Sequence, residues 1–344
     1  MPTYEDIAKI AGVSKATVSL ALSDSAKISS NTKFKIRNIA KSIGYNIDKI
    51  ESAKQIRNRS IGILYFSENP DFEKDFFRDT LLGISEDASN NGYDVVFIGI
   101  HWRIGEDFND DVADKVMRTG VEGIIVLSRT ANLNGFGRLM EMRFPMVFVG
   151  DRKVVGFDNQ LYNVCSDNYN GGRMAAEYLL GLGHPDLALV SLHTPPHWEL
   201  DRANGFFSQA KNAGLTDIET RSVQISDPFD PNDPSWAKLA ELNPSAIFAI
   251  NARAGISIIH HLRLAGKRIP DDVSLLVFDD FSAFPYENPP ITVIKQDKEA
   301  LGNLSAKVLI DLLENSKVPP KQMLISTQLI ERQSCAPYKG TRTK

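Results

Sequence analysis

Three side chains near the start of the chain have the types and spacing to read a nucleic acid. Lys15, Ala16 and Ser19 fall on one face of a short segment with helical periodicity, close to its N-terminus. That part of a helix reaches base edges when the helix lies in a major groove. A plain helical hairpin belonging to some core would show the same periodicity, so both interpretations stand at this point.

The surrounding residues predict two short helices joined by a tight turn. Gly12 can take the left-handed conformation that ends a first helix, and Ser14 is a good N-cap for a second. A third helix is expected to begin near Ser29 and to run to about Ile43. The apolar positions expected to face the core of this three-helix unit are Ile7, Ala8, Ala11, Val18, Leu22, Ile36, Ala40 and Ile43.

The run YEDIAKIAGVSKATVSLAL resembles the N-terminal DNA-binding motif of the LacI/GalR family of bacterial transcription regulators, usually written IA..AGVS..TVS. The resemblance implies a helix-turn-helix head and continues through nearly the whole chain. In the family the position of Leu20 often holds a polar reader, whereas Leu20 offers only apolar contact, for example with thymine methyls. The resemblance assigns DNA contacts to Thr3, Tyr4, Ser14, Lys15, Ala16, Thr17, Ser19, Leu20, Lys27, Ser29 and Thr32.

The segment 47–59 corresponds to the family's hinge helix, which folds when two subunits meet on DNA and inserts an apolar side chain into a minor-groove base step. Ala53 and Ile56 best match the alanine and the inserted residue, which is usually leucine. Ile47 stands where proline is common, and the linker before Ile61 is short. An ordinary solvated linker is the alternative for this segment.

Charge is distributed unevenly along the 344 residues. Residues 1–60 carry 11 Lys and Arg against 5 Asp and Glu, whereas the rest carry 28 against 38, for a formal net charge of −4. A basic head on an acidic body suggests that the head meets a polyanion and the body does not. No signal peptide or long apolar run is visible, so a cytoplasmic protein is expected. Cys165 and Cys335 are expected to be inert thiols, because they form no metal or redox spacing.

From Ile61 onward, apolar strands alternate with helices, which predicts parallel sheets with helices on both faces. One sheet this long would be unusual, so two lobes are expected, as in periplasmic sugar-binding proteins and in the regulatory domain of the LacI/GalR family. The predicted organisation is a helix-turn-helix head at 1–46, a hinge at 47–59, a two-lobed α/β body at 60–336 and a tail at 337–344. The predicted N-lobe holds about 60–165 and 291–320, and the C-lobe about 166–290 and 321–336.

A ligand cleft in such a body lies at the carboxyl ends of the parallel strands. Carboxylate, amide and guanidinium groups there can bind hydroxyl or ring N–H groups, and aromatic rings can form flat walls. Asp280 is expected to be a cap or a salt-bridge partner, and Arg152 and Asp167 to be structural or rim residues. The predicted effector-binding residues are Phe76, Phe77, Asp151, Arg202, Trp236, Asn251 and Asp279. Trp236 is expected in a loop over the opening, Arg202 at the start of a helix, and either phenylalanine could instead belong to the core.

No catalytic, metal or cofactor site is expected. The six histidines have no metal-ligand spacing, and no P-loop, dinucleotide-binding glycine motif or GxSxG motif occurs. The resemblance implies a homodimer, possibly a tetramer, that binds double-stranded operator DNA and a sugar-like or nucleoside/purine-like effector. The alternatives are a solute-binding protein without a regulatory role, which leaves residues 1–60 unexplained, and a cleft enzyme on the same scaffold.

Overall fold

The chain folds into two compact units in this computed structural model, residues 1–60 with 120–122 and residues 61–119 with 123–344. Lys27, Ala53, Ile56 and Asp151, four of the predicted contact residues, lie outside the residues that the structure describes. Those described residues are 2–22, 28–45, 59–66, 70–99, 112–128, 134–150, 160–193, 195–228, 230–315 and 319–340.

The first unit contains the three predicted helices, α1 (Tyr4–Ala11), α2 (Lys15–Leu22) and α3 (Ser30–Ser42). Gly12 ends α1 at φ +68°, a conformation that costs a residue without a side chain little. The hydroxyl of Ser14 accepts from the Thr17 N–H at 3.1 Å, and the hydroxyl of Ser29 caps α3. The predicted core is confirmed, because Ile7, Ala8, Ala11, Val18, Leu22, Ile36 and Ala40 are buried, with Ile43 packed against them. Ala21, which was not predicted, is buried in the same cluster.

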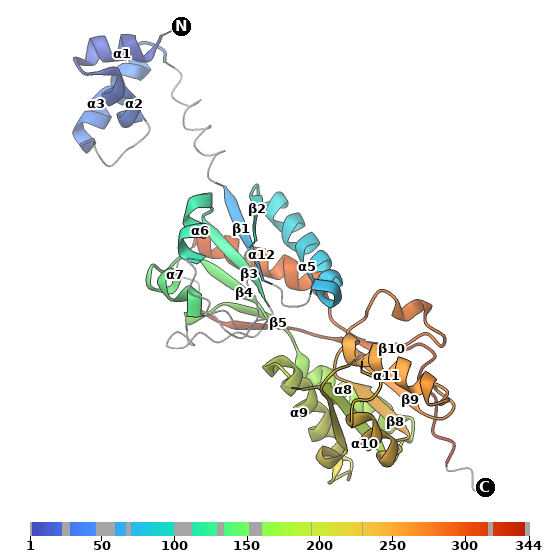
Figure 1. Cartoon of the computed structure of the whole chain (residues 1–344). Helices are drawn as coiled ribbons and strands as arrows, with labels where there is room; N and C mark the ends of the chain where they lie inside the picture. The colour runs from blue at the N-terminus through green and yellow to red at the C-terminus, as the bar shows by residue number, and fades with distance from the viewer. Residues whose placement is uncertain are drawn as a thin grey trace. The chain divides into compact units, whose positions relative to one another are not determined.

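The second unit contains two lobes, each built on a six-stranded sheet in the described part of the chain (Figure 1). The first-lobe sheet has the order β11-β5-β4-β3-β1-β2. Its strands are β1 (Ser60–Phe66), β2 (Asp94–Gly99), β3 (Gly123–Ser128), β4 (Met146–Val149), β5 (Asn163–Ser166) and β11 (Gln322–Ile325). Its helices are α5 (Pro70–Asn90), α6 (Val112–Thr119), α7 (Gly137–Glu141) and α12 (Lys298–Glu314), with a 3-10 turn at Asn134–Phe136.

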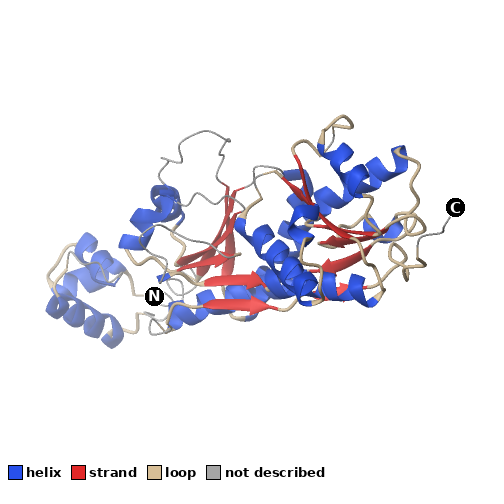
Figure 2. Cartoon of the chain, turned by 90° about the horizontal axis from the view of Figure 1, so that it is seen from below, coloured by secondary structure: helices blue, strands red, loops and turns tan. Residues whose placement is uncertain are grey.

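The second-lobe sheet has the order β12-β10-β9-β8-β6-β7. Its strands are β6 (Leu187–Leu192), β7 (Ser222–Ile225), β8 (Ala246–Ala249), β9 (Ser274–Phe278), β10 (Thr292–Lys295) and β12 (Gln328–Ile330). Its helices are α8 (Asn168–Gly181), α9 (His197–Asn212), α10 (Ser235–Leu242) and α11 (Ala252–Leu264), with 3-10 turns at Ile218–Arg221 and Phe284–Tyr286. In Figure 2 helices flank the strands of the sheets.

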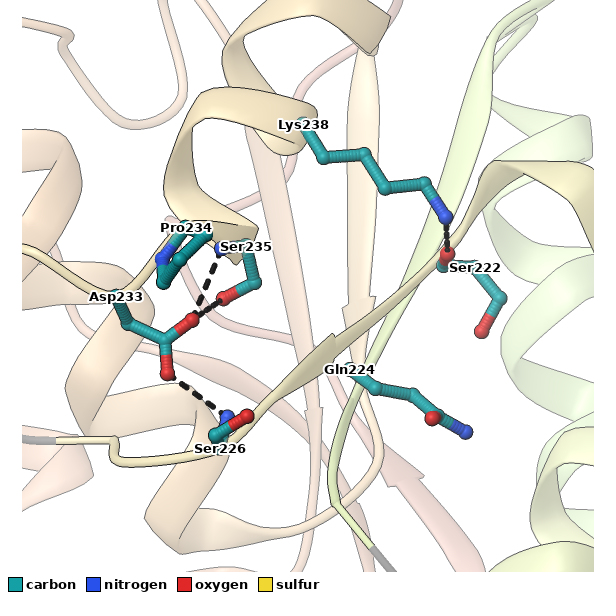
Figure 3. Close-up of a pocket in the computed structure, with 7 residues that line it drawn as sticks. All are labelled: Ser222, Gln224, Ser226, Asp233, Pro234, Ser235 and Lys238. Carbon is teal, nitrogen blue, oxygen red and sulfur yellow. Dashed lines mark hydrogen bonds between the residues drawn. The ribbon is translucent and has the colours of Figure 1, made fainter.

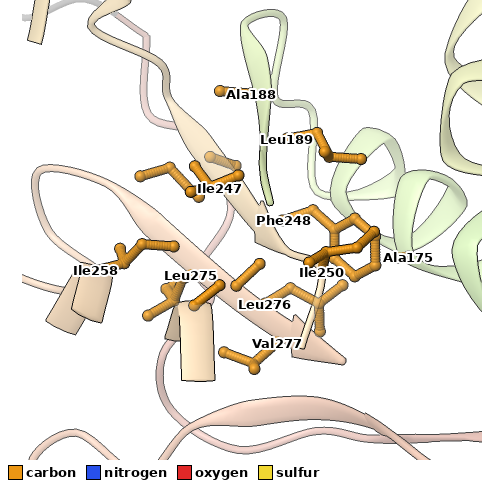
Figure 4. Close-up of a cluster of buried hydrophobic side chains, with 14 of the residues drawn as sticks. Ala175, Ala188, Leu189, Ile247, Phe248, Ile250, Ile258, Leu275, Leu276 and Val277 are labelled. Carbon is orange, nitrogen blue, oxygen red and sulfur yellow. The ribbon is translucent and has the colours of Figure 1, made fainter. Parts of the chain in front are cut away.

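Burial on both faces explains why the central strands are almost continuously apolar. β8 and β9 are buried along their whole length, and β6 along most of it. Their side chains contribute to the large second-lobe core, part of which is drawn in Figure 4. Leu189 of β6, Phe248 of β8, Leu276 of β9 and Ala175 of α8 all belong to this buried cluster. These strands pair in parallel, whereas β12 runs antiparallel to β10. The predicted fold class is confirmed.

The chain crosses between the lobes after β5, after β10 and between β11 and β12. The predicted first crossing near Cys165 agrees with this order. The predicted lobe boundaries at 291 and 321 are wrong. β10 was assigned to the N-lobe but belongs to the second sheet, and β11 was assigned to the C-lobe but belongs to the first. The sequence misplaces both because strands of four residues carry too short an apolar pattern to be assigned to a sheet.

In each lobe, one pair of helices packs backbone against backbone through glycines. Gly83 of α5 and Gly302 of α12 face each other, so that a methyl group on either would stand 2.1 Å from a carbonyl oxygen of the other helix. Gly172 of α8 and Gly205 of α9 repeat the arrangement at 1.9 Å. Figure 1 shows α12 beside α5 although more than 200 residues separate them in the chain. The absence of a side chain at these glycines therefore allows the two helices of each pair to pack closely against each other.

The C-terminal segment is bound to the second lobe as far as Tyr338, which lies within the predicted tail at 337–344. The Ser334 hydroxyl accepts from the Thr292 N–H at 2.8 Å and donates to the Leu275 carbonyl at 2.6 Å. The Tyr338 N–H donates to the Leu182 carbonyl at 2.8 Å. Most of these bonds use backbone groups, which every sequence carries, so the sequence gives no signal for them. The described part of the predicted tail at 337–344 therefore continues the body.

We expect Gly205→Ala to destabilise the protein, because the added methyl group meets the carbonyl oxygen of Tyr169 and the two helices must separate. The expected loss is about 1–3 kcal/mol of unfolding free energy in a denaturant titration. Gly181→Ala is the matched control, since Gly181 lies in α8, the partner helix of the same pair, and a methyl group there meets nothing within 4 Å. It should be neutral or stabilise by about 1 kcal/mol. Equal effects from both variants would contradict the close-packing explanation.

We also expect His184 to make stability depend on pH. Burial lowers the pKa of His184, although its contact with the Ala336 carbonyl at 3.1 Å acts in the opposite direction. The unfolded chain therefore takes up this proton at a higher pH than the folded chain, and stability falls as the pH falls below about 6.5. His184→Asn should reduce the difference in urea midpoint between about pH 8 and pH 5. The same substitution at exposed His260 should leave it unchanged.

Candidate functional site

The outer face of α2 presents the side chains that the sequence assigns to base contact. Lys15, Ala16, Ser19 and Leu20 are exposed, and Val18 is buried behind them in the head core. The capped N-terminus of α2 thus carries a cation, small side chains and one apolar side chain on a surface that a duplex can approach. The Lys15 ammonium lies 2.7 Å from a carboxylate oxygen of Glu5 on α1.

The other predicted DNA-contacting residues of the head lie mainly at helix starts. Thr3 forms a capping box with Asp6, and the Ser29 hydroxyl accepts from the Thr32 N–H at 3.3 Å. Backbone N–H groups at capped helix N-termini are well placed to bind phosphate oxygens. Tyr4 differs, because its ring packs against the head core and lies 5.6 Å from the ring of Tyr45.

In the body, Arg202 is the centre of a buried polar cluster. Its side chain is 4% exposed, and its Nε donates to the side-chain oxygen of Asn168 at 2.9 Å. Its Nη1 donates to the Ile250 carbonyl at 3.0 Å and to the Asp279 carboxylate at 3.3 Å. The guanidinium also lies over the Phe278 ring, 3.7 Å from the ring centroid. The cluster therefore holds a paired cation at the carboxyl ends of β8 and β9.

Two further residues close this cluster into a ring of hydrogen bonds. The amide of Gln296, directly after β10, donates to Asp279, and the Ser166 hydroxyl at the end of β5 donates to the Gln296 side-chain oxygen at 2.6 Å. The Asn168 amide then donates to the Ser166 carbonyl at 3.1 Å. We call Ser166, Asn168, Arg202, Asp279 and Gln296 the Arg202 ring. Because Ser166 and Gln296 lie where the chain crosses between the lobes, the ring joins the predicted effector-binding residues Arg202 and Asp279 to those crossings.

Asn251 lies beside the Arg202 ring but serves as a cap. Its side-chain oxygen accepts from the Ala254 N–H at the start of α11, and its amide donates to Glu199 at 2.8 Å. Asp279 adopts φ +78°, a conformation that Asp and Asn tolerate better than most residues. The structure thus brings Arg202 and Asp279 into direct contact and places Asn251 next to the Ile250 carbonyl that Arg202 uses.

Two predicted placements are wrong. Arg202 does not open its helix, because α9 begins at His197 and Arg202 lies in the second turn. Trp236 is not in a covering loop: it lies in α10, is 5% exposed and stacks on His261 with ring centroids 4.2 Å apart. Its indole N–H donates to the Asp230 carbonyl at 3.0 Å, so this tryptophan belongs to the second-lobe core.

The remaining predicted residues have mixed positions. Phe76 and Phe77 are half-buried on α5 and pack against the first-lobe core, Phe77 with its ring 4.3 Å from that of Tyr65. Asp280 is a salt-bridge partner as predicted, bound through both carboxylate oxygens by Arg332 at 2.9 and 2.8 Å. The Asp167 carboxylate caps α8, which agrees with its predicted structural role.

Sequence reasoning missed Ser166, Asn168, Glu199 and Gln296. Ser166 and Asn168 follow β5, and Gln296 follows β10, so the rule that sites gather after parallel strands applies to them as well. The apolar runs that mark these strands, NVCS and TVIK, were not read as strands, and the polar residues after them were therefore not considered.

A separate cavity of about 500 Å³ lies at the outer edge of the second sheet (Figure 3). Burial by itself would raise the pKa of Asp233, but hydrogen bonds from the Ser235 hydroxyl and from the backbone of Asp227, Ser235 and Ser226 lower it to about 2. These bonds hold the turn before α10, so Asp233 has a structural role. None of the predicted site residues lines this cavity, whose residues are Ser222, Gln224, Ser226, Asp233, Pro234, Ser235 and Lys238.

The described residues contain no helix that is both long and apolar enough to cross a membrane. They also contain no group of three or more His, Cys, Asp or Glu side chains placed to hold a metal ion.

Comparisons with known proteins divide the chain in the same way. Residues 3–47 match the family described as bacterial regulatory proteins, lacI family, and residues 176–335 match the periplasmic binding protein-like domain. The probable HTH-type transcriptional repressor ExuR of Bacillus subtilis (strain 168) is 28% identical over 341 residues, covering 97% of this chain and 98% of the relative. The HTH-type transcriptional regulator CelR of Thermobifida fusca is 26% identical over 337 residues, covering 97% and 98%.

Solved structures agree with this division. The transcriptional regulator CelR–cellobiose complex has a TM-score of 0.70 and covers 97% of this chain and 100% of its own, and at 24% identity it supports the fold alone. A LacI family transcriptional regulator from Enterococcus faecium with bound ribose has a TM-score of 0.67 at 26% identity, covering 81% and 100%. The matched regulators are DNA-binding transcription proteins and not enzymes.

We expect Asp279→Asn to destabilise the protein by about 2 kcal/mol, because the buried Arg202 would lose the charge that compensates it. Asparagine tolerates the positive φ at this position, so the change isolates the charge. A denaturant titration measures the loss. Asp272→Asn is the matched control, since it removes a carboxylate from Arg268, whose side chain is 65% exposed. It should have little effect, and an equally large effect would contradict the importance of burial.

Proposed function

This chain belongs to the LacI family of bacterial regulatory proteins, and from that premise we propose that it is a repressor whose operator affinity is controlled by a small polar metabolite. The observation that carries the proposal is the occurrence of two distinct sites in one chain. One is the exposed face of α2 on a basic head. The other is the Arg202 ring at the strand ends of the body.

The head supports the DNA side of the proposal. Residues 1–60 carry an excess of six positive charges, which favours contact with a phosphate backbone. A recognition helix of eight residues can reach only a few base pairs, so we propose a homodimer that places two heads in successive major grooves of a pseudo-palindromic operator. Residues 47–59, with Ala53 and Ile56, are proposed to form the hinge in the minor groove.

The body supports the ligand side. A guanidinium and a carboxylate beside amide groups offer donors and acceptors for hydroxyl or ring N–H groups. Two similar regulators were solved with cellobiose and with ribose. We therefore propose a sugar-like effector, with a nucleoside- or purine-like effector as the second class. Phe76, Phe77 and Asp279 remain proposed contacts. Trp236 is not a proposed contact, because it is buried in the second-lobe core.

The proposed control acts through the Arg202 ring. A ligand that bonds to Arg202 or Asp279 would compete with their existing hydrogen bonds. Gln296 and Ser166 would then shift at two of the chain crossings, which changes the relation of the lobes and so the pairing of the hinge segments. This coupling requires that the ligand bind the two lobe arrangements with different affinity.

A solute-binding protein without a regulatory role is the alternative function. The body alone is compatible with it, because periplasmic binding proteins have the same two-lobed fold. The helix-turn-helix head argues against it, since transport of a solute does not require a DNA-binding head. An absence of sequence-specific DNA binding by the full-length protein would favour this alternative.

We expect Arg202→Ala to abolish ligand binding and to leave operator binding intact, because Arg202 is far in sequence from the head and bonds to Asn168 and Ile250 of the body. The measurement is thermal shift of full-length protein against a panel containing cellobiose, ribose, nucleosides and purines, beside gel-shift assays on DNA flanking the gene. Arg332→Ala is the matched control, because Arg332 also pairs with a partly buried carboxylate, that of Asp280, but lies outside the Arg202 ring. It should retain the ligand response. An unchanged ligand affinity in Arg202→Ala would overturn the cleft assignment.

A further inference from the structure

The first turn of α1 carries two carboxylates that serve different purposes. Asp6 completes the capping box, since its Oδ2 accepts from both the N–H and the hydroxyl of Thr3 at 2.8 Å. Glu5 takes no part in that cap. Its Oε1 instead accepts from the Lys15 ammonium at 2.7 Å. Glu5 therefore stands beside the first side chain of the recognition helix.

This ion pair is not needed to hold the head together. The side chains of Glu5 and Lys15 are 73% and 62% exposed, and ion pairs exposed to that degree add little stability. The helices are held by the buried core around Ile7, Val18 and Ile36. A carboxylate at the surface of a DNA-binding head also repels phosphates, so its presence there calls for a favourable contact that offsets the repulsion.

The major-groove edge of a C·G base pair offers such a contact. Cytosine presents the N4 amino group as a donor, and the guanine opposite presents O6 and N7 as acceptors. A carboxylate can accept from N4 while an adjacent ammonium donates to O6 and N7. The 2.7 Å spacing of Glu5 Oε1 and Lys15 Nζ suits this edge, because N4 and O6 are themselves hydrogen-bonded neighbours within the pair.

The same groups discriminate against the other base pairs. In the reversed G·C orientation the carboxylate would face O6 and N7, which are acceptors and repel it. An A·T pair offers a donor to the carboxylate but only one acceptor, O4, to the ammonium. Building on the proposed function, we propose that Glu5 is a specificity-determining residue, which together with Lys15 selects a C·G pair in one orientation at one position of each operator half-site.

The test is selection of a randomised duplex library by full-length wild-type protein and by Glu5→Gln, followed by sequencing and by affinity measurements on the enriched site. Wild type should enrich a C·G pair at one position per half-site and discriminate against G·C there by roughly tenfold. Glu5→Gln should lose most of this discrimination and shift toward A·T, because glutamine matches the N6 and N7 groups of adenine. Preferences at the other positions should persist.

Asp6→Asn is the matched control, because it removes the same charge from the neighbouring residue. It should raise affinity for all sequences alike or weaken the head through the lost cap, with the enriched site unchanged. If Glu5→Gln also enriches the wild-type site and only binds all DNA more tightly, the carboxylate acts through charge alone and the inference is wrong. If wild type enriches no site at all, the proposed function itself fails.

Discussion

The second lobe depends on how the buried charge of Arg202 is compensated. A guanidinium that is 4% exposed has lost nearly all of its water, and leaving it unpaired would cost several kcal/mol. Its hydrogen-bond acceptors come from the start of α8, the end of β8 and the residue after β9. The parallel sheet brings those three chain segments to one edge, because its parallel strands end on the same side. Compensation of the Arg202 charge therefore depends both on the strand order and on the position of Arg202 on α9.

The groups that compensate Arg202 include Asp279, which is also a proposed ligand contact. Asp279 is bound on one side by Arg202 and on the other by Gln296, and Gln296 in turn is bound by Ser166. Any ligand that alters one of these bonds leaves its neighbours to be satisfied in another way, since unpaired buried polar groups are costly. A ligand bound at these strand ends would therefore act on the chain crossings through the hydrogen bonds of Gln296 and Ser166. No long series of packed side chains is needed between the two places.

The sequence predicts the head nearly completely because its signals are local. Gly12, Ser14 and Ser29 each mark a helix end by their own chemistry, and the apolar spacing around Ile7 identifies the core. In the body, long apolar runs such as LALVSL and SLLVF reveal their strands. Runs of four residues do not, and this is why the polar residues after β5 and β10 were missed. Trp236 was misplaced because the prolines before it suggest a loop, whereas α10 begins directly after Pro234 and buries the indole.

The two sites differ in how closely their function is tied to the fold. In the head, the buried side chains hold the helices, and the side chains that face outward, among them Glu5, Lys15 and Ala16, contribute little to that core. Sequence preference for DNA can therefore change by exposed substitutions at almost no cost in stability. In the body the opposite holds, because the proposed ligand contacts Arg202 and Asp279 also compensate each other within the fold. A change of ligand must preserve that compensation, so variation in ligand preference is expected at the surrounding walls more than in the Arg202 ring itself.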